Sequence, residues 1–152
     1  MGAAVDHVIP IGMSRGSVEG NDKSQGQRFS SKSKLTALVV DNGGVCCAIQ
    51  TALLRSYGVG TEAVETGGAA VELISSGATF SLIIIEMLLP FMNGPETAKQ
   101  IRAIGAQSKV LGITAFFDER DQQEFLAARA DDFIEKPLSL EIVIPIIREL
   151  NN

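Results

Sequence analysis

The stretch Ser81-Leu-Ile-Ile-Ile-Glu86 indicates the fold of this chain. Its unbroken, β-branched apolar run is typical of a parallel strand that is buried on both faces. Such strands present their last side chain at the carboxyl edge of the sheet, where α/β proteins place their sites. Glu86 is therefore a candidate site residue; the alternative is a solvated strand terminus.

Strand-like and helix-like segments alternate from Leu35 onward. The strand patterns cover 35–41, 60–64, 80–86, 109–114 and 132–135, and each precedes a segment with helical spacing, at 45–57, 66–76, 95–105, 118–130 and 139–150. Short loops between such units require right-handed crossovers and a parallel sheet covered on both faces. We predict an α/β, doubly wound, flavodoxin-like (βα)5 fold with five parallel strands in the order 2-1-3-4-5.

The composition predicts one domain and an extension. Residues 34–152 contain the periodic segments, whereas residues 1–33 have no sustained periodicity and are expected to be a flexible N-terminal extension. The net charge of −5 argues against nucleic acid or an anionic membrane as a partner, and the apolar runs are too short to span a bilayer. The N-terminus lacks a secretory-signal pattern, so we expect a cytoplasmic and nuclear protein. We also expect a monomer.

Polar residues follow the predicted strands at the edge where a site is expected. They are Asp41, Asn42, Glu86, Thr114 and Lys136. Acid and amide oxygens are suitable ligands for a hard cation, and the hydroxyl and ammonium groups are able to bind phosphoryl oxygens. Pro137 follows the lysine, and a Lys-Pro bond in a tight loop is a candidate for the cis form.

The segment 35–150 resembles the receiver domain of two-component response regulators. Four pieces in the right order carry this resemblance: Val39-Val-Asp41-Asn42, the run from Ile83 to Gly94, Gly112-Ile-Thr114-Ala115, and Glu135-Lys136-Pro137. The pieces around Thr114 and Lys136, with the proline in the last helix, are similar to plant receiver-only regulators of the cytokinin phosphorelay, called type C. The chain ends after the last predicted helix, so we expect a stand-alone receiver without a DNA-binding output domain.

The resemblance implies a metal site that is altered in this chain. Receivers hold Mg²⁺ with an acidic pair after the first strand; Asp41 matches the first acid, and the neutral Asn42 replaces the second. The carbonyl of Leu88 matches the third protein ligand. A neutral amide is a weaker ligand for a hard dication, so we expect weak Mg²⁺ binding at Asp41, Asn42, Glu86 and Leu88, and no required cofactor.

The resemblance also assigns the phosphoryl chemistry. Glu86 stands where receivers have the phosphoacceptor aspartate, while Thr114 and Lys136 match the switch hydroxyl and the phosphate-binding lysine. Phe133 lies at the aromatic switch position. The longer arm of Glu86 displaces its carboxylate by about 1 Å, an error that costs roughly a hundredfold in rate. We expect Glu86 to reach Lys136 and form a charge-assisted pair in place of a phosphoryl group.

The resemblance, with these departures from it, implies a degenerate receiver that binds and regulates within a histidine-to-aspartate phosphorelay and is not an enzyme. The expected partner is a histidine-containing phosphotransfer protein, docked against Val45, Cys46, Pro137 and Leu138. One alternative is a residually active receiver that drains phosphate from that partner. Another is a flavodoxin-like module for a small molecule. Whether Glu86 imitates the phosphorylated state or only disables the site stays open.

Overall fold

The computed structural model describes residues 34–152 and confirms the predicted fold class. Within this range five parallel strands form one sheet in the order β2-β1-β3-β4-β5. In chain order the elements are β1 (Thr36–Val40), α3 (Gly44–Ser56), β2 (Gly60–Val64), α4 (Gly67–Ser75), β3 (Leu82–Glu86), α5 (Gly94–Ile104), β4 (Lys109–Thr114), α6 (Glu119–Ala127), β5 (Asp132–Glu135) and α7 (Leu140–Leu150). The predicted flexible extension, 1–33, lies outside the described residues.

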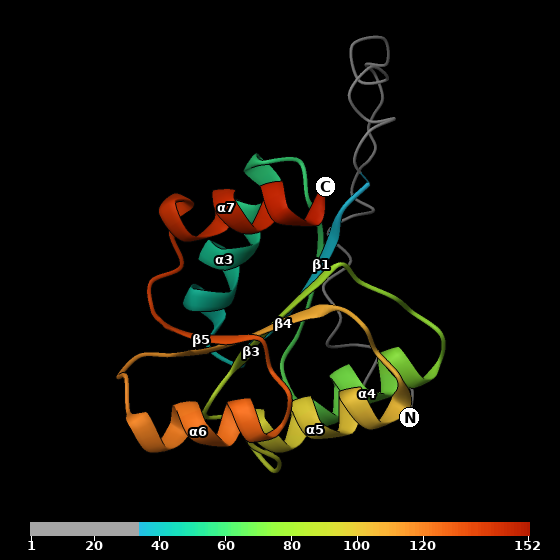
Figure 1. The fold of residues 1–152 in the computed structure, drawn as a ribbon, viewed down its shortest axis with the longest axis vertical. Coiled ribbons are helices and arrows are strands. Elements are labelled where there is room, and N and C mark those ends of the chain that lie inside the picture. Colours follow the sequence, from blue (N-terminus) through green and yellow to red (C-terminus); the bar gives the residue numbers. More distant parts are fainter. Residues whose placement is uncertain (1–33) are drawn as a thin grey trace, which may run out of the picture.

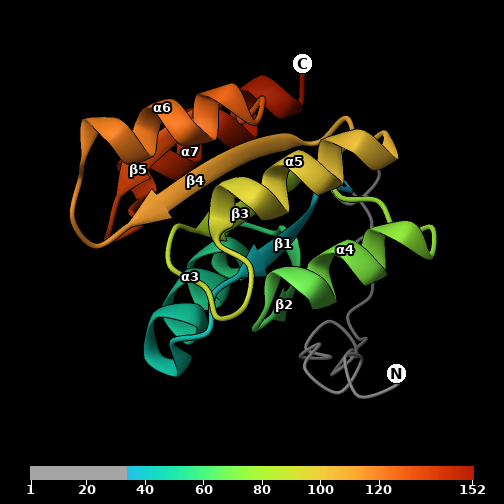
Figure 2. The same ribbon diagram turned by 90° about the horizontal axis from the view of Figure 1, so that it is seen from below.

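Helices cover both faces of the sheet, as a doubly wound fold requires. Helices α3 and α7 lie on one face, and α4, α5 and α6 lie side by side on the other (Figures 1 and 2). The side chains of β3 alternate between the two resulting cores: Ile83 and Ile85 join one, and Leu82 and Ile84 join the other. This burial on both faces explains why β3 is a continuous apolar run.

Side-chain caps start three of the helices. Thr66, Asn93 and Asp118 each accept a hydrogen bond from a backbone N–H of the helix that follows, with donor–acceptor distances of 2.8 to 3.0 Å. Ser139 occupies the same position before α7, but its side chain makes no capping bond, contrary to what a serine there predicts. Helix α6 ends at Ala127, earlier than expected, and Arg129 has a left-handed backbone with φ of 70°.

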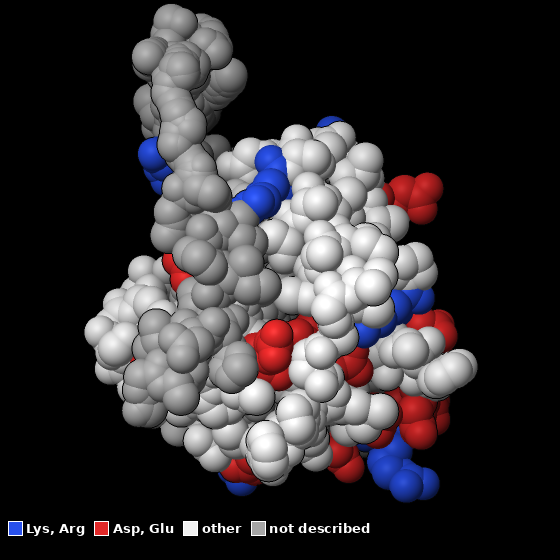
Figure 3. Space-filling view, turned by 180° about the vertical axis from the view of Figure 1, so that it is seen from behind, with Lys and Arg blue, Asp and Glu red and all other residues white. Residues whose placement is uncertain are grey.

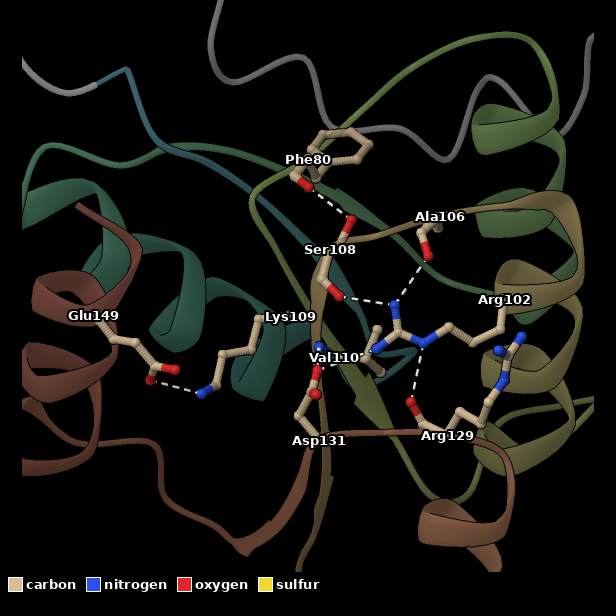
Figure 4. A network of polar contacts seen from close by, with 9 residues as sticks. All are labelled: Phe80, Arg102, Ala106, Ser108, Lys109, Val110, Arg129, Asp131 and Glu149. Atoms are coloured by element: carbon tan, nitrogen blue, oxygen red, sulfur yellow. Dashed lines mark hydrogen bonds and ion pairs between the residues drawn. The ribbon is translucent and has the colours of Figure 1, made fainter. Parts of the chain in front are cut away.

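The amino-terminal edge of the sheet is held together by Arg102 of α5 (Figure 4). Its guanidinium donates to the carbonyl oxygens of Ala106, Ser108 and Arg129 at 2.8 to 3.0 Å. It also contacts Asp131 Oδ2 at 3.1 Å. A planar group with several donors is suited to joining these three turns at once. The network therefore fixes the edge of the sheet opposite the predicted site.

The surface seen in Figure 3 mixes charges of both signs. On this face the lysine and arginine side chains of the described residues stand apart from one another, among acidic and uncharged groups. No helix within residues 34–152 has the length and apolarity needed to cross a membrane.

Candidate functional site

The predicted site residues meet at the carboxyl edge of the sheet. Asp41 follows β1, Glu86 ends β3, and Lys136 follows β5. Strands β1 and β3 are neighbours, with Val40 opposite Ile85, so the two carboxylates end up side by side. Lys136 reaches them from the loop after β5, and its bond to Pro137 is cis, as predicted.

Lys136 forms an ion pair with both carboxylates. Its Nζ lies 2.5 Å from Glu86 Oε1 and 3.1 Å from Asp41 Oδ2. Asp41 and Glu86 are almost fully buried, with exposed fractions of 2% and 6%. Burial by itself lowers the pKa of Lys136, but the hydrogen bonds and charges of Glu86 and Asp41 outweigh it and raise the pKa above its ordinary value. The predicted contact between Glu86 and Lys136 is therefore present, and the ammonium stays charged.

The remaining carboxylate oxygens also have donors. The backbone N–H of Gly43 donates to Asp41 Oδ1 at 2.8 Å, and the side-chain amide of Gln50 donates to Asp41 Oδ2 at 3.1 Å. The backbone N–H of Leu88 donates to Glu86 Oε2 at 3.1 Å. Each of the four oxygens of the two acids thus contacts an N–H group or the ammonium of Lys136.

The donor chemistry at this edge suits a hard cation, but its arrangement does not. Magnesium requires several oxygen ligands directed at one point. Here the ammonium of Lys136 lies against both acids, and Asn42 is exposed with no side-chain hydrogen bond among the described residues. Within residues 34–152 no three His, Cys, Asp or Glu side chains are grouped so as to hold a metal ion. In this arrangement the residues do not fit Mg²⁺.

Thr114 and Phe133 lie around this centre, and among residues 34–152 neither makes a hydrogen bond or ion pair with Asp41, Glu86 or Lys136. Thr114 is buried at the end of β4, and its hydroxyl faces its own loop, 3.3 Å from the carbonyl oxygen of Phe116. The ring of Phe133 is buried between Phe117 and Phe125, with centroid distances of 5.4 Å to each. The aromatic position thus contributes to packing in this conformation.

The sequence of this chain was compared with family models and with known proteins. The model of the response regulator receiver domain matches residues 37–148. The chain belongs to the response regulator receiver family. This receiver is 39% identical to Two-component response regulator 24 of Arabidopsis thaliana over 120 residues, which are 79% of this chain and 86% of that protein. It is 38% identical to Two-component response regulator ORR42 of rice, Oryza sativa subsp. japonica, over 117 residues, 77% of this chain and 87% of that one.

A solved structure is similar to this receiver in fold and, more weakly, in sequence. It is the co-crystal structure of the Saccharomyces cerevisiae histidine phosphotransfer signaling protein Ypd1 with the receiver domain of its downstream response regulator Ssk1. The TM-score is 0.68 at 25% identity, with 78% of this chain and 89% of the other covered.

The expected docking residues of the receiver divide into exposed and buried ones. Val45 is 74% exposed in the first turn of α3, Cys46 is half-buried, and Pro137 is exposed. The prediction of Leu138 as a surface contact is wrong, because it is 5% exposed and belongs to a core cluster with Val143. Leu138 directly precedes the N-cap of α7 and Val143 is four residues inside that helix, the positions of a hydrophobic staple.

Gln50 is a site residue that the motifs did not reveal. It lies on α3, is 3% exposed, and donates to Asp41, while its own Oε1 has no hydrogen-bond partner among the described residues. The sequence signal that could have identified Gln50 was its helical spacing from the apolar residues of α3. Buried residues of α3 recur as Cys47, Gln50, Thr51 and Leu54, so a glutamine on this apolar stripe indicates a polar contact beneath the helix.

Proposed function

We propose that this receiver acts by binding within a histidine-to-aspartate phosphorelay, in plant cytokinin signalling, and does not itself accept phosphate. The observation that carries the proposal is the ion pair of Lys136 with Glu86 and Asp41. The ammonium of Lys136 neutralises part of the negative charge of the two acids, and it is engaged by Glu86 where it would otherwise contact a phosphoryl group.

Phosphoryl transfer depends on an acceptor oxygen in line with the incoming phosphorus and on cationic groups around the equatorial oxygens. Glu86 Oε1 is buried against Lys136 Nζ, and Glu86 Oε2 accepts from the backbone of Leu88. For Glu86 to attack, one of these contacts must break, and the lysine that should stabilise the phosphoryl group must leave its present partners. Both requirements raise the activation barrier for phosphoryl transfer to Glu86.

The surface around this centre supports a binding role. Large apolar side chains stand exposed on α3 and on the loops after β3 and β4, a set that we call the site rim: Val45, Ile49, Leu88, Phe91 and Phe116. Phe91 is 99% exposed and has a left-handed backbone with φ of 68°. That conformation costs about 1–2 kcal/mol for a residue with a Cβ. A strained backbone that holds an aromatic side chain in solvent is typical of functional surfaces.

The chemistry of the site rim fits a partner with an apolar docking face. Apolar contacts at the desolvated centre of an interface carry most of its binding energy. The Ssk1 receiver, which is similar in fold, is crystallised with a histidine phosphotransfer protein. We therefore propose a protein of this class as the partner of the site rim, and competition with phosphate-accepting receivers as its effect.

The deciding experiment uses a histidine phosphotransfer protein that carries labelled phosphate. With this chain present we expect a complex by gel filtration, while the label stays on the partner and none appears on Glu86. Acid-labile label on Glu86 would contradict the proposal. So would the absence of a complex with several phosphotransfer proteins.

A residually active receiver is the second candidate, because Thr114 and Lys136, which match the phosphoryl-binding residues of receivers, lie at the same edge of the sheet as Asp41 and Glu86. It predicts magnesium-dependent loss of label from the phosphotransfer protein. Glu86→Gln should abolish that loss, since an amide is no phosphate acceptor. Loss of label that persists in Glu86→Gln would mean that another group is responsible.

Val45→Glu is expected to weaken binding to the phosphotransfer protein by about 1–3 kcal/mol, because it puts a charge at the centre of an apolar contact. The folded state should tolerate it, since Val45 is exposed and an acid in the first turn of a helix interacts favourably with the helix dipole. Calorimetric titration measures the loss, with Ala103→Glu, at an exposed position of α5, as the control. Equal affinities for the two variants would remove α3 from the interface.

A further inference from the structure

The connection between β1 and α3 contains the dipeptide Asn42-Gly43 next to the buried carboxylate of Asp41. Asn42 is exposed, and its side chain makes no hydrogen bond or ion pair among the described residues. Gly43 has no side chain that would shield its backbone nitrogen. A carboxamide that is free to rotate beside a glycine nitrogen is the arrangement in which an asparagine cyclises, once the hydrogen bond from the Gly43 N–H to Asp41 Oδ1 has opened.

We propose that Asn42-Gly43 is a deamidation site, through which the chain acquires the second acid of its Asp41-Asn42 pair. The backbone nitrogen of Gly43 bonds to Cγ of Asn42, and the Cγ–Nδ2 bond breaks. Ammonia leaves with the proton of the Gly43 amide, and a succinimide remains. Water then opens the ring, at Cγ to give aspartate or at the main-chain carbonyl to give isoaspartate. Water is the only co-reactant, and nothing is oxidised or reduced.

One contact controls the rate of this step. The nitrogen that must attack is the one whose N–H donates to Asp41 Oδ1 at 2.8 Å, so that bond has to open first. The same contact explains the glycine, because a Cβ at position 43 would lie 3.3 Å from Asp41 Oδ1, which is tighter than ordinary packing. The backbone approach that orders Asp41 thus favours the residue that makes Asn42 reactive.

The chain contains a matched comparison in Asn93-Gly94. There Asn93 Oδ1 accepts from the N–H of Glu96 as the cap of α5, and the N–H of Gly94 donates to the carbonyl of Met87 at 2.9 Å. Gly94 is buried, and a Cβ on it would collide with the carbonyl oxygen of Glu86. Two contacts must open at Asn93 and one at Asn42. We expect Asn93 to react about tenfold more slowly, since a capping bond must be lost as well.

The product should alter the site beneath it. A carboxylate at position 42 adds a negative charge beside Asp41, at the N-terminus of α3, whose first turn holds no acidic residue. Cations are then attracted more strongly to this edge, and the balance between Lys136 and a dication shifts. This consequence rests on the function proposed above, whereas the covalent step does not.

The experiment ages the full chain at mildly alkaline pH and follows it by peptide mass mapping and isoaspartate detection. We expect the peptide with Asn42 to become acidic while the peptide with Asn93 keeps its amide. Asn42→Gln is the matched control, because its longer amide would have to close a less favourable six-membered ring. Retention of the amide at Asn42, or equal rates at Asn42 and Asn93, overturns the proposal.

Calorimetric titration with Mg²⁺ alone tests the consequence. Asn42→Asp and the aspartate fraction of the aged chain should bind Mg²⁺ about tenfold more tightly than fresh chain, and aged Asn42→Gln should not change. Deamidation without any gain in Mg²⁺ affinity overturns the regulatory consequence. Neither measurement involves a phosphotransfer protein, so a failure of partner binding is detected separately, in the complex-formation assay.

Discussion

Glu86→Asp combined with Asn42→Asp is expected to make this receiver accept phosphate from a labelled phosphotransfer protein, roughly a hundredfold faster than the parent chain. Shortening the side chain at position 86 withdraws its carboxylate from Lys136 Nζ, now 2.5 Å away. The acid at position 42 adds charge at the exposed end of the site. The two changes together free the lysine for the phosphoryl group and provide acids for a cation.

The single substitutions separate these effects. Glu86→Asp alone should recover little label, because position 42 stays neutral, and Asn42→Asp alone should recover little, because the acceptor stays misplaced. Metal charge and acceptor position act as a unit, so the combined effect should exceed the sum of the single effects in free energy. Acid-labile label per mole of protein, measured with and without Mg²⁺, is the readout. Full labelling of Glu86→Asp alone would show that Asn42 is no obstacle.

The fold was predictable because its signals are local and repeated. Apolar strands such as β3, and helices that begin after Thr66 or end before Gly105, have boundaries marked by their own residues. The alternation with right-handed crossovers predicts a parallel sheet covered on both faces, and the flavodoxin-like fold gives its strand order. The left-handed turn at Arg129, which ends α6 early, has no such signal. A residue with a Cβ adopts that conformation at a steric cost, so the tertiary structure determines where it occurs.

The site was predictable as far as strand ends determine it. Asp41, Glu86 and Lys136 meet because parallel strands end at one edge, which the pattern already implied. The role of Leu138 was not predictable from the sequence. Pro137 is exposed and Leu138 is buried, and this difference follows from the packing of Leu138 against Val143 in the core cluster. Gln50 reaches Asp41 from the neighbouring helix, so its role depends on helix packing rather than on a motif.

Lys136→Met is expected to destabilise the folded domain by about 3 kcal/mol, because it leaves two buried carboxylates without their shared cation. Asp41 and Glu86 are both nearly inaccessible, and they come close enough for one ammonium to contact both. Chemical denaturation of the parent and the variant measures the difference. Lys109→Met is the matched control: it breaks the pair with Glu149, whose carboxylate is largely exposed, and should cost at most about 1 kcal/mol.

The pH dependence follows from the raised pKa of Lys136. A lysine whose pKa is higher in the folded state stabilises fully below its unfolded pKa of about 10.4, and this contribution is lost as the pH rises through the folded value. The stabilising contribution of Lys136 in the parent should therefore not decline between neutral pH and about pH 9.

A second substitution tests whether charge is the cause. Glu86→Gln in the Lys136→Met background removes one of the two stranded charges at nearly constant shape, so it should recover part of the lost stability. In the parent background the same change breaks a favourable pair and should destabilise. This reversal of sign is the signature of electrostatic coupling, since lost packing at position 136 would leave the effect of Glu86→Gln unchanged. An equal effect of Glu86→Gln in both backgrounds would mean that Lys136 stabilises through its aliphatic stem, and that the acids tolerate each other without it.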